Sequence, residues 1–319
     1  MTYTIAVTDF DFPDLSIESA ALEEMDAELV TVDAESPSDI VDAVPEANAL
    51  LVQYATISET VFDELEDLRA VGRYGIGVDN VDLDAATNHG VWVVNVPSYC
   101  EEEVSTHSLS LMLNCLRNVS GYDRAIKDGR WDWTEGKPIN RISGKTIGFA
   151  GFGKIPQHLM TLLGGFDLDY VAYDPYLSRT ELTDQGVDKV DFGELLSTSD
   201  VLSVHVPLTD ETKRMFDADA FSQMQDHAII VNTARGAVID TNDLHTALQR
   251  REIAGAGLDV MPVEPPEDTS LIEHENVVCT PHVAWYSEES MAEMRRTVTQ
   301  DVAGIIRENA PKNPVNDLE

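Results

Sequence analysis

The sequence predicts an α/β protein built from two doubly wound, parallel-sheet domains. Short apolar runs that resemble strands alternate with amphipathic stretches along the whole chain, which is typical of parallel sheets covered by helices. The 319 residues exceed one ordinary core and suit two domains of about 100–200 residues each. The runs also form two series, separated by a long helical stretch and a polar arm.

The first hundred residues carry the first series. No glycine-rich phosphate loop follows its opening strand, so this part is predicted to be a doubly wound domain without a nucleotide-binding fingerprint. The expected strands are Tyr3–Thr8, Leu29–Val32, Ala49–Val52, Ala70–Tyr74 and Val91–Val94, and the expected helices include Ile17–Met25, Ile40–Val44 and Leu83–Asn88.

A long helix is predicted at Glu101–Arg117, and an irregular arm with Trp131 and Trp133 follows it to about Gly144. Tryptophans on a polar arm indicate packing against another subunit, with packing on the same chain as the alternative. A second series of strands and a final helix at about 288–306 come next. The expected strands are Thr146–Ala150, Tyr170–Tyr173, Val201–Val204, Ala228–Val231, Ile253–Leu258 and Val277–Cys279.

The composition excludes several classes of protein. No apolar run reaches the roughly 20 residues of a membrane-spanning helix, and the first residues do not resemble a signal peptide. Cys100, Cys115 and Cys279 form no Cys-x-x-Cys pair, so neither a disulfide framework nor a metal site is expected, and a reducing cytoplasm fits best. The net charge of −37 disfavours nucleic acid as a partner, because that binding needs a basic surface.

The acidic residues are spread along the whole chain, and Lys is rarer than Arg, 7 against 14. Self-repulsion of this size loosens a fold unless salt screens it, with a Debye length of about 3 Å at 1 M salt. The pattern resembles that of proteins that work in molar salt. We therefore expect a halophilic protein from a high-salt cytoplasm.

A Gly-x-Gly sequence lies between a predicted strand and a predicted helix. Gly151 permits the tight turn, and Gly153 lets the backbone approach a pyrophosphate that the amino end of the helix attracts. Pro156 replaces the third glycine of the dinucleotide fingerprint. Proline is tolerated there because the first turn of a helix lacks intrahelical acceptors for its N–H groups. A Rossmann dinucleotide-binding domain is therefore predicted.

Asp174 ends the next strand, 21 residues after Gly153. A carboxylate at this position accepts hydrogen bonds from the adenosine ribose and repels a 2′-phosphate, so NAD is favoured over NADP. The alternative is a turn aspartate before Pro175.

Three further segments place polar residues just beyond strand ends, where open α/β sheets bind ligands. They carry Arg235, Glu264 and His282. A guanidinium grips a carboxylate through paired hydrogen bonds, and an imidazole donates and recovers a proton. A carboxylate on the other imidazole nitrogen fixes the tautomer and favours the charged form. These residue types suit the reduction of a keto acid, although each alone has an ordinary structural explanation.

From about Arg73 to Glu288 the chain resembles the D-isomer-specific 2-hydroxyacid dehydrogenase family. Within that family it is similar to the subgroup of the C-terminal-binding corepressors, through Tyr173–Ser178 and Pro281–Glu288. The family motifs matched are Arg73-Tyr-Gly-Ile-Gly77-Val-Asp79-Asn80, Asn95-Val-Pro97, Gly151-Phe-Gly153, Asn232-Thr-Ala-Arg235-Gly236, Asp259-Val and Pro281-His282.

The resemblance implies Arg235, Glu264 and His282 as catalytic residues, and a substrate held by Arg73, Ile76, Gly77 and Trp285. Trp285 has the alternative of packing at a domain interface. A flavodoxin-like substrate domain of residues 1–100 plus 292–319 is implied, with a Rossmann domain of 101–291 and a homodimer joined through 101–144. The implied cofactor contacts are Gly151, Gly153, Lys154, Ile155, Asp174, Val206, Pro207, Thr212, Thr233, Ala234 and Asp259.

The predicted function is hydride transfer between NAD(H) and a small 2-keto or D-2-hydroxy acid. The alternative from another class is a dinucleotide-sensing, corepressor-like interaction protein. Formate dehydrogenases carry glutamine where Glu264 stands, which disfavours that branch. Glyoxylate, hydroxypyruvate and phosphoglycerate dehydrogenases remain open within the enzyme class. An apolar substrate side chain is expected, because Trp285 and Ile76 favour buried methylenes and no second cluster of cations accompanies the motifs.

Overall fold

The computed structural model describes residues 2–34 and 36–318, which form two compact units. One unit comprises residues up to Tyr99 together with Ser287 onward, and the other comprises Cys100–Tyr286. The predicted boundaries lay at residues 100 and 292. No helix in the described ranges is long and apolar enough to cross a membrane.

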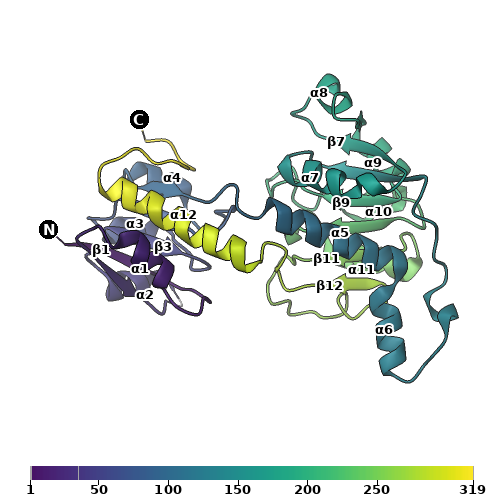
Figure 1. Cartoon of the computed structure of the whole chain (residues 1–319), viewed down its shortest axis with the longest axis horizontal. Coiled ribbons are helices and arrows are strands. Elements are labelled where there is room, and N and C mark those ends of the chain that lie inside the picture. Colours follow the sequence, from purple (N-terminus) through teal and green to yellow (C-terminus); the bar gives the residue numbers. More distant parts are fainter. Residues whose placement is uncertain (1, 35, 319) are drawn as a thin grey trace. The chain divides into compact units, whose positions relative to one another are not determined.

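The first unit is a five-stranded parallel sheet in the order β2-β1-β3-β4-β5, which is the flavodoxin-like order. Helices α1 and α12 contact each other on one face, and on the other face α3 contacts both α2 and α4 (Figure 1). The strands are β1 Tyr3–Val7, β2 Ala27–Thr31, β3 Ala49–Val52, β4 Ala70–Arg73 and β5 Trp92–Val94. The helices are α1 Ser16–Leu22, α2 Pro37–Ala43, α3 Glu59–Glu64, α4 Leu83–Asn88 and α12 Glu288–Ile306.

A buried ion pair attaches the distant helix α12 to this unit. Nη2 of Arg295 lies 2.6 Å from Oε2 of Glu18 on α1, and both side chains are almost fully buried, at 3% and 0% exposed. Tyr74 donates its hydroxyl to the same carboxylate. Removing one partner of such a pair costs about 3–5 kcal/mol, because the other charge stays buried alone. Helix α12 therefore belongs to the first unit over its whole length.

The second unit is a seven-stranded parallel sheet in the order β12-β11-β10-β9-β6-β7-β8. Its central part has the Rossmann order, so both predicted doubly wound sheets are confirmed. The strands are β6 Lys145–Ala150, β7 Leu168–Tyr173, β8 Asp188–Lys189, β9 Val201–Val204, β10 Ile229–Asn232, β11 Gly255–Leu258 and β12 Val277–Cys279. The helices are α5 Glu101–Arg117, α6 Val119–Lys127, α7 Lys154–Leu162, α8 Arg179–Thr183, α9 Phe192–Thr198, α10 Ala218–Gln223 and α11 Thr241–Arg250.

Apolar cores fill both faces of the second sheet. Helices α5 and α7 cover one core, which includes Leu111 and Leu159, and α9, α10 and α11 cover the other. The arm after α5 differs from the prediction, because its first part is the helix α6 and not an irregular segment. Asn118 takes the left-handed conformation, with φ 49°, and so ends α5 and lets α6 begin in a new direction.

Candidate active site

The glycine-rich loop leads from β6 into α7. Gly151 has φ +84°, and a β carbon there would lie 3.1 Å from the backbone of His205, so glycine is required. Gly153 is the N-cap of α7, and a β carbon on it would meet nothing within 4 Å. Open space at a helix amino end, where N–H groups lack intrahelical acceptors, suits a pyrophosphate. The loop therefore fits a dinucleotide.

Pro156 is the third residue of α7 and is buried. Its place in the first turn means that no intrahelical hydrogen bond is lost. The amides at the beginning of the helix are thus those of Lys154 and Ile155, and the side chain of Lys154 lies 3.3 Å from Glu101 of α5.

Asp174 follows β7 and makes contact with the glycine-rich loop. Its Oδ2 accepts a hydrogen bond of 2.9 Å from the amide of Phe152, and its Oδ1 accepts from the amides of Tyr176 and Leu177. The residue therefore shapes the turn before Pro175 and also faces the dinucleotide loop. A carboxylate has about four acceptor positions, so one remains for a ribose hydroxyl.

The other predicted cofactor residues lie after the carboxyl ends of neighbouring strands. Val206 and Pro207 follow β9, and the Pro207 carbonyl accepts a hydrogen bond of 2.5 Å from the hydroxyl of Thr212. Thr233 and Ala234 follow β10, and the amide of Ala234 donates to the side chain of Asn232. All of them share the sheet edge at which β6 and the glycine-rich loop end.

Arg235 is held by the strand end that precedes it. Asn232 donates its side-chain N–H to the carbonyl of Arg235 at 2.9 Å, and Nη1 of Arg235 donates to the carbonyl of Ala234 at 2.8 Å. The 3₁₀ turn Gly236–Val238 begins at once, and a β carbon on Gly236 would lie 2.0 Å from the carbonyl carbon of Met261. This close approach brings the loop of Arg235 against the loop that carries Glu264.

Glu264 lies between a backbone amide and the imidazole of His282. Oε2 lies 2.7 Å from Nδ1 of His282, and Oε1 accepts from the amide of Met261 at 2.8 Å. Burial alone would raise the pKa of Glu264, but the hydrogen bonds from His282 and Met261, with the charges of His282 and Arg235, lower the pKa below its usual value. Glu264 is therefore an ionised acceptor, and Nδ1 of His282 carries the proton.

His282 has an unusual backbone conformation, with φ 53°. Asp259 holds this conformation with both its backbone carbonyl and its side-chain carboxylate. The Asp259 carbonyl accepts from the amide of His282 at 2.8 Å, and its buried carboxylate accepts from the amides of Val283 and Ala284 and from the hydroxyl of Thr280. The imidazole itself is 46% exposed, so its Nε2 side can meet a ligand.

Trp285 lies three residues after His282, and its ring packs edge-on against Tyr286, with the centroids 5.6 Å apart. Arg235, Glu264, His282 and Trp285 thus all lie in the second unit, and Glu264 is within electrostatic reach of both His282 and Arg235.

The predicted substrate loop belongs to the first unit and follows β4. Nη1 of Arg73 donates to the carbonyl of Tyr74 at 2.6 Å. The side chain of Asn95 donates to the carbonyl of Ile76 at 2.6 Å, so the loop is tied to the end of β5. Ile76 is 37% exposed, and Gly77 follows it in the same loop.

Four polar residues at this edge of the sheet were not predicted from the sequence. Asp9 and Asp11 follow β1, and Gln53 and Tyr54 follow β3. Asp9 accepts from the amides of Gln53 and Tyr54, and Asp11 accepts from the side chains of both. Partial burial and the Asp11 carboxylate raise the pKa of Tyr54 to about 12. Their position after strand ends was the available signal, the same one that identified Arg235.

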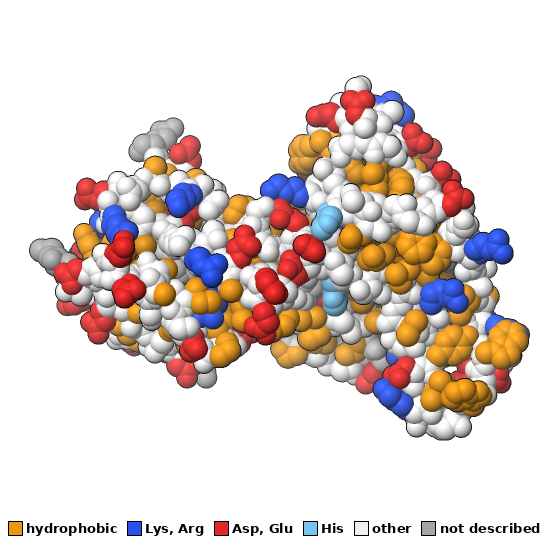
Figure 2. Space-filling view, in the orientation of Figure 1, with side chains coloured by type: hydrophobic (Ala, Val, Ile, Leu, Met, Phe, Trp, Pro, Cys, Tyr) orange, Lys and Arg blue, Asp and Glu red, His pale blue; other side chains and the backbone are white. Residues whose placement is uncertain are grey.

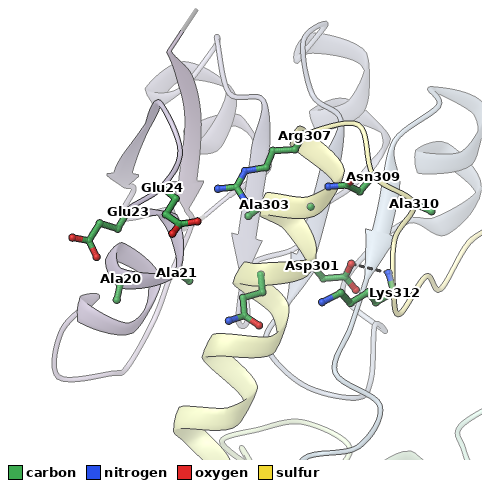
Figure 3. Close-up of a pocket in the computed structure, with 12 residues that line it drawn as sticks. Ala20, Ala21, Glu23, Glu24, Asp301, Ala303, Arg307, Asn309, Ala310 and Lys312 are labelled. Carbon is green, nitrogen blue, oxygen red and sulfur yellow. Dashed lines mark hydrogen bonds between the residues drawn. The ribbon is translucent and has the colours of Figure 1, made fainter.

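A hollow of about 500 Å³ lies elsewhere in the first unit, between α1 and the end of α12 (Figure 3). Glu23 and Glu24 line one side, and Arg307 and Lys312 line the other. Arg69, which precedes β4, donates to the carbonyl of Ile306, so this hollow is at the amino edge of the sheet. The substrate loop is at the carboxyl edge, and the hollow is therefore not part of the candidate site.

No group of three or more metal-ligating side chains capable of holding a metal occurs within residues 2–34 and 36–318.

The chain is similar to known proteins both in sequence and in structure. Residues 109–284 match the NAD-binding domain of the D-isomer specific 2-hydroxyacid dehydrogenases. The chain belongs to this family. It is 30% identical to the apo-structure of D-lactate dehydrogenase from Escherichia coli, with a TM-score of 0.83 over 98% of this chain and 99% of that one. The family prediction from the sequence is confirmed.

Two further relatives bear on the comparison. D-lactate dehydrogenase from Aquifex aeolicus, solved with NAD and lactic acid, has a TM-score of 0.88 at 25% identity, over 99% of this chain and 100% of that one. D-3-phosphoglycerate dehydrogenase 2 from Arabidopsis thaliana is 37% identical over 284 residues, which are 88% of this dehydrogenase-family chain and 45% of that protein. The chain spans about half the length of the curated relatives it matches.

The narrower resemblance to the C-terminal-binding corepressors is not supported, because the curated relatives matched by sequence are phosphoglycerate dehydrogenases. The segments behind it, Tyr173–Ser178 and Pro281–Glu288, are short. They contain Asp174 and His282, which belong to the candidate site that the wider family resemblance already implies.

Proposed function

We propose that this family member is an NAD-dependent dehydrogenase that interconverts a small 2-keto acid and the D-2-hydroxy acid. The observation that carries the proposal is the 2.7 Å contact between Glu264 and Nδ1 of His282, with Arg235 nearby, at the sheet edge that also bears the glycine-rich loop. Bound NADH supplies the hydride for reduction. The chain supplies the proton and the grip on the substrate.

His282 is the proton donor in this proposal. Because Glu264 accepts at Nδ1, the Nε2–H of the imidazolium is left for the substrate ketone oxygen. The ionised Glu264 stabilises the imidazolium before the transfer and holds the ring in place afterwards. Arg235 would pair with the substrate carboxylate through its guanidinium.

In this proposal the loop of Arg73, Ile76 and Gly77 also binds the substrate carboxylate. Asn95 holds the Ile76 carbonyl, which fixes the direction of the peptide that follows and so favours a donor N–H at Gly77. We assign Trp285 to the substrate side chain, because it shares the short loop of His282.

The charges in the first unit favour a substrate without a phosphate. Asp9 and Asp11 lie at the same sheet edge as the substrate loop, whose one cation is Arg73. A phosphate recruits several cations or free amides, and two carboxylates would oppose it. Phosphoglycerate is the alternative substrate, because the curated relatives named above are phosphoglycerate dehydrogenases.

NAD is preferred over NADP in this proposal. The Asp174 carboxylate faces the glycine-rich loop through Phe152, and a negative charge there repels a 2′-phosphate. The fixed hydrogen bonds to Tyr176 and Leu177 keep this charge from turning away.

The proposed partner is a second copy of the chain. Trp131 and Trp133 are 87% and 70% exposed, and Val119 and Ile126 are 58% and 49% exposed. Figure 2 shows hydrophobic side chains gathered over α6 and the segment after it. Apolar patches of this kind mark interaction sites, and Lys137 already lies 4.2 Å from the Trp133 ring centroid, which pre-orders that indole.

Steady-state kinetics with NADH in molar KCl test the proposed function. We expect turnover of pyruvate, 2-ketobutyrate and 2-ketohexanoate, with kcat/KM rising with chain length because each buried methylene contributes about 0.8 kcal/mol. Trp285→Ala should flatten that rise. A clear preference for 3-phosphohydroxypyruvate would overturn the substrate proposal, and no turnover of any 2-keto acid would overturn the function.

A further inference from the structure

Helix α5 makes polar contacts with three loops of the candidate site. The hydroxyl of Ser105 contacts the carbonyl of Ile155 at 3.0 Å, beside the glycine-rich loop. The hydroxyl of Ser108 contacts that of Thr233 at 2.8 Å, beside Arg235. Between them, Nε2 of His107 lies 2.9 Å from the hydroxyl of Thr280, two residues before His282. No sequence motif pointed to His107.

The position of α5 on the sheet is fixed by close packing. Gly257 of β11 lies directly beneath the helix, and a β carbon there would lie 3.0 Å from Cβ of Leu111. Even an alanine there would require Leu111 to shift by a few tenths of an ångström. Because α5 packs this closely on the sheet, its His107 side chain reaches Thr280, which lies 173 residues further along the chain.

The direction of the hydrogen bonds follows from donor and acceptor counting. The hydroxyl of Thr280 lies 2.5 Å from Oδ1 of Asp259, a length typical of a hydroxyl that donates to a carboxylate. The same carboxylate accepts from the amides of Val283 and Ala284. A threonine hydroxyl has one proton, which is used here, so Thr280 must accept from His107. Nε2 of His107 therefore carries a proton.

We infer that His107 is a positioning residue for the catalytic loop, an inference that rests on the proposed function of His282. Its Nε2–H fixes the hydroxyl of Thr280, which points its own proton at Asp259. The anchored Asp259 then holds the amides of residues 282–284 and so keeps His282 at φ 53°. Nε2 of His107 also lies 3.5 Å from Oδ1 of Asp259 itself, so His107 supports Asp259 both through Thr280 and directly, and it acts on His282 through these residues.

Matched variants separate this role from simple packing. His107→Gln keeps an N–H at nearly the same reach, whereas His107→Leu removes it at similar volume. Thr280→Ser keeps the hydroxyl, and Thr280→Val removes it. We expect His107→Leu and Thr280→Val each to lower kcat about 10- to 100-fold, the scale of a small misplacement of a catalytic group. The Gln and Ser variants should recover most of that loss.

The double variant His107→Leu/Thr280→Val should be no slower than the worse single variant, because both remove one connection. NADH affinity, measured by fluorescence titration, should change by less than about threefold. Equal impairment of the Gln and Leu variants would overturn the inference, as would losses that multiply in the double variant. If His107→Leu fails to fold, His107→Ala, which also removes the N–H, takes its place and is compared with His107→Gln, beside the Thr280→Val and Thr280→Ser pair.

Hydrogen exchange gives a readout that does not depend on turnover. The amides of Val283 and Ala284 should exchange faster in His107→Leu and Thr280→Val than in His107→Gln and Thr280→Ser. If wild type turns over no 2-keto acid, the proposed function fails, and the exchange rates still test the positioning. Equal exchange in all four variants would overturn the inference.

Discussion

Nδ1 of His282 lies 2.7 Å from Oε2 of Glu264, across two loops that follow different strands of one sheet. The amide of Met261 donates a hydrogen bond to the other carboxylate oxygen, so both oxygens of Glu264 are held in place. The pair is built entirely within residues 100–286. This arrangement sets the protonation of the imidazole and the face that it offers to a substrate.

Glu264→Gln should shift the pH profile of keto-acid reduction. The pKa of Glu264 is lowered by its contacts with His282, Met261 and Arg235, despite burial, so the carboxylate stays ionised above about pH 4.5. The ionised Glu264 therefore adds to the stability of the fold at pH values above its pKa in the unfolded chain. This contribution is lost only as the pH falls through the lower pKa of Glu264 in the folded protein. In Glu264→Gln the imidazolium of His282 has no negatively charged partner. The pH above which kcat/KM for reduction falls should therefore be about one to two units lower than in wild type.

The measurement is kcat/KM against pH, with Glu267→Gln as a control in the same loop. Glu267 is exposed, and its variant should keep the wild-type profile. A Glu264→Gln profile that coincides with wild type would remove Glu264 from its role as partner of the imidazolium.

Asp174→Ser should weaken the preference for NADH over NADPH. Loss of a hydrogen bond to a charged group is worth about 1.5–3 kcal/mol, or roughly 10- to 100-fold in the ratio of kcat/KM values for the two cofactors. Asp184→Ser, at the exposed end of α8, serves as the control and should leave the ratio unchanged. Tighter binding of NADPH than of NADH by wild type would contradict the role assigned to Asp174.

The double variant Trp131→Ser/Trp133→Ser should dissociate the proposed homodimer. Light scattering after size exclusion should give wild type twice the mass of one chain and the variant a single mass. Tyr176→Ser tests whether any exposed aromatic residue has this effect, since Tyr176 is 88% exposed outside the arm. Wild type that is monomeric at micromolar concentration in molar salt would refute the dimer.

The net charge of −37 should make the fold depend on salt. Acidic side chains are scattered over the visible surface (Figure 2), and the Debye length grows from about 3 Å at 1 M salt to about 10 Å at 0.1 M. We expect the thermal midpoint to fall by at least about 10 °C between 3 M and 0.1 M KCl, which corresponds to about 2.5–5 kcal/mol at 2–4 °C per kcal/mol. Equal midpoints in NaCl, KCl and dilute buffer would contradict a halophilic surface.

Local patterns in the sequence were enough to predict the fold and the cofactor loop. The alternation of apolar runs predicted both sheets, and the spacing of Gly151 and Asp174 is short enough for one βαβ unit to bring them together. Helix α6 was missed because Asn118, Gly121 and their neighbours read as turn formers. The left-handed Asn118 instead caps one helix and begins the next.

Contacts between distant segments could not be predicted in the same way. The pairing of His107 with Thr280 depends on how closely α5 sits on Gly257, and no spacing along the chain reports that. The carboxylates of Asp9 and Asp11 meet Gln53 and Tyr54 only because β1 and β3 are neighbours in the sheet. Arg235, Glu264 and His282 were identified by their residue types and by family resemblance.

The most direct test of the account is the turnover of His282→Ala, measured beside His89→Ala. Both histidines contact a carboxylate, His282 with Glu264 at 2.7 Å and His89 with Asp63 at 3.0 Å, but His89 lies outside the proposed site. We expect His282→Ala to lower kcat by about 10²- to 10⁴-fold, the usual contribution of a positioned proton donor, with NADH affinity nearly unchanged and His89→Ala fully active. Wild-type turnover in His282→Ala would contradict the account.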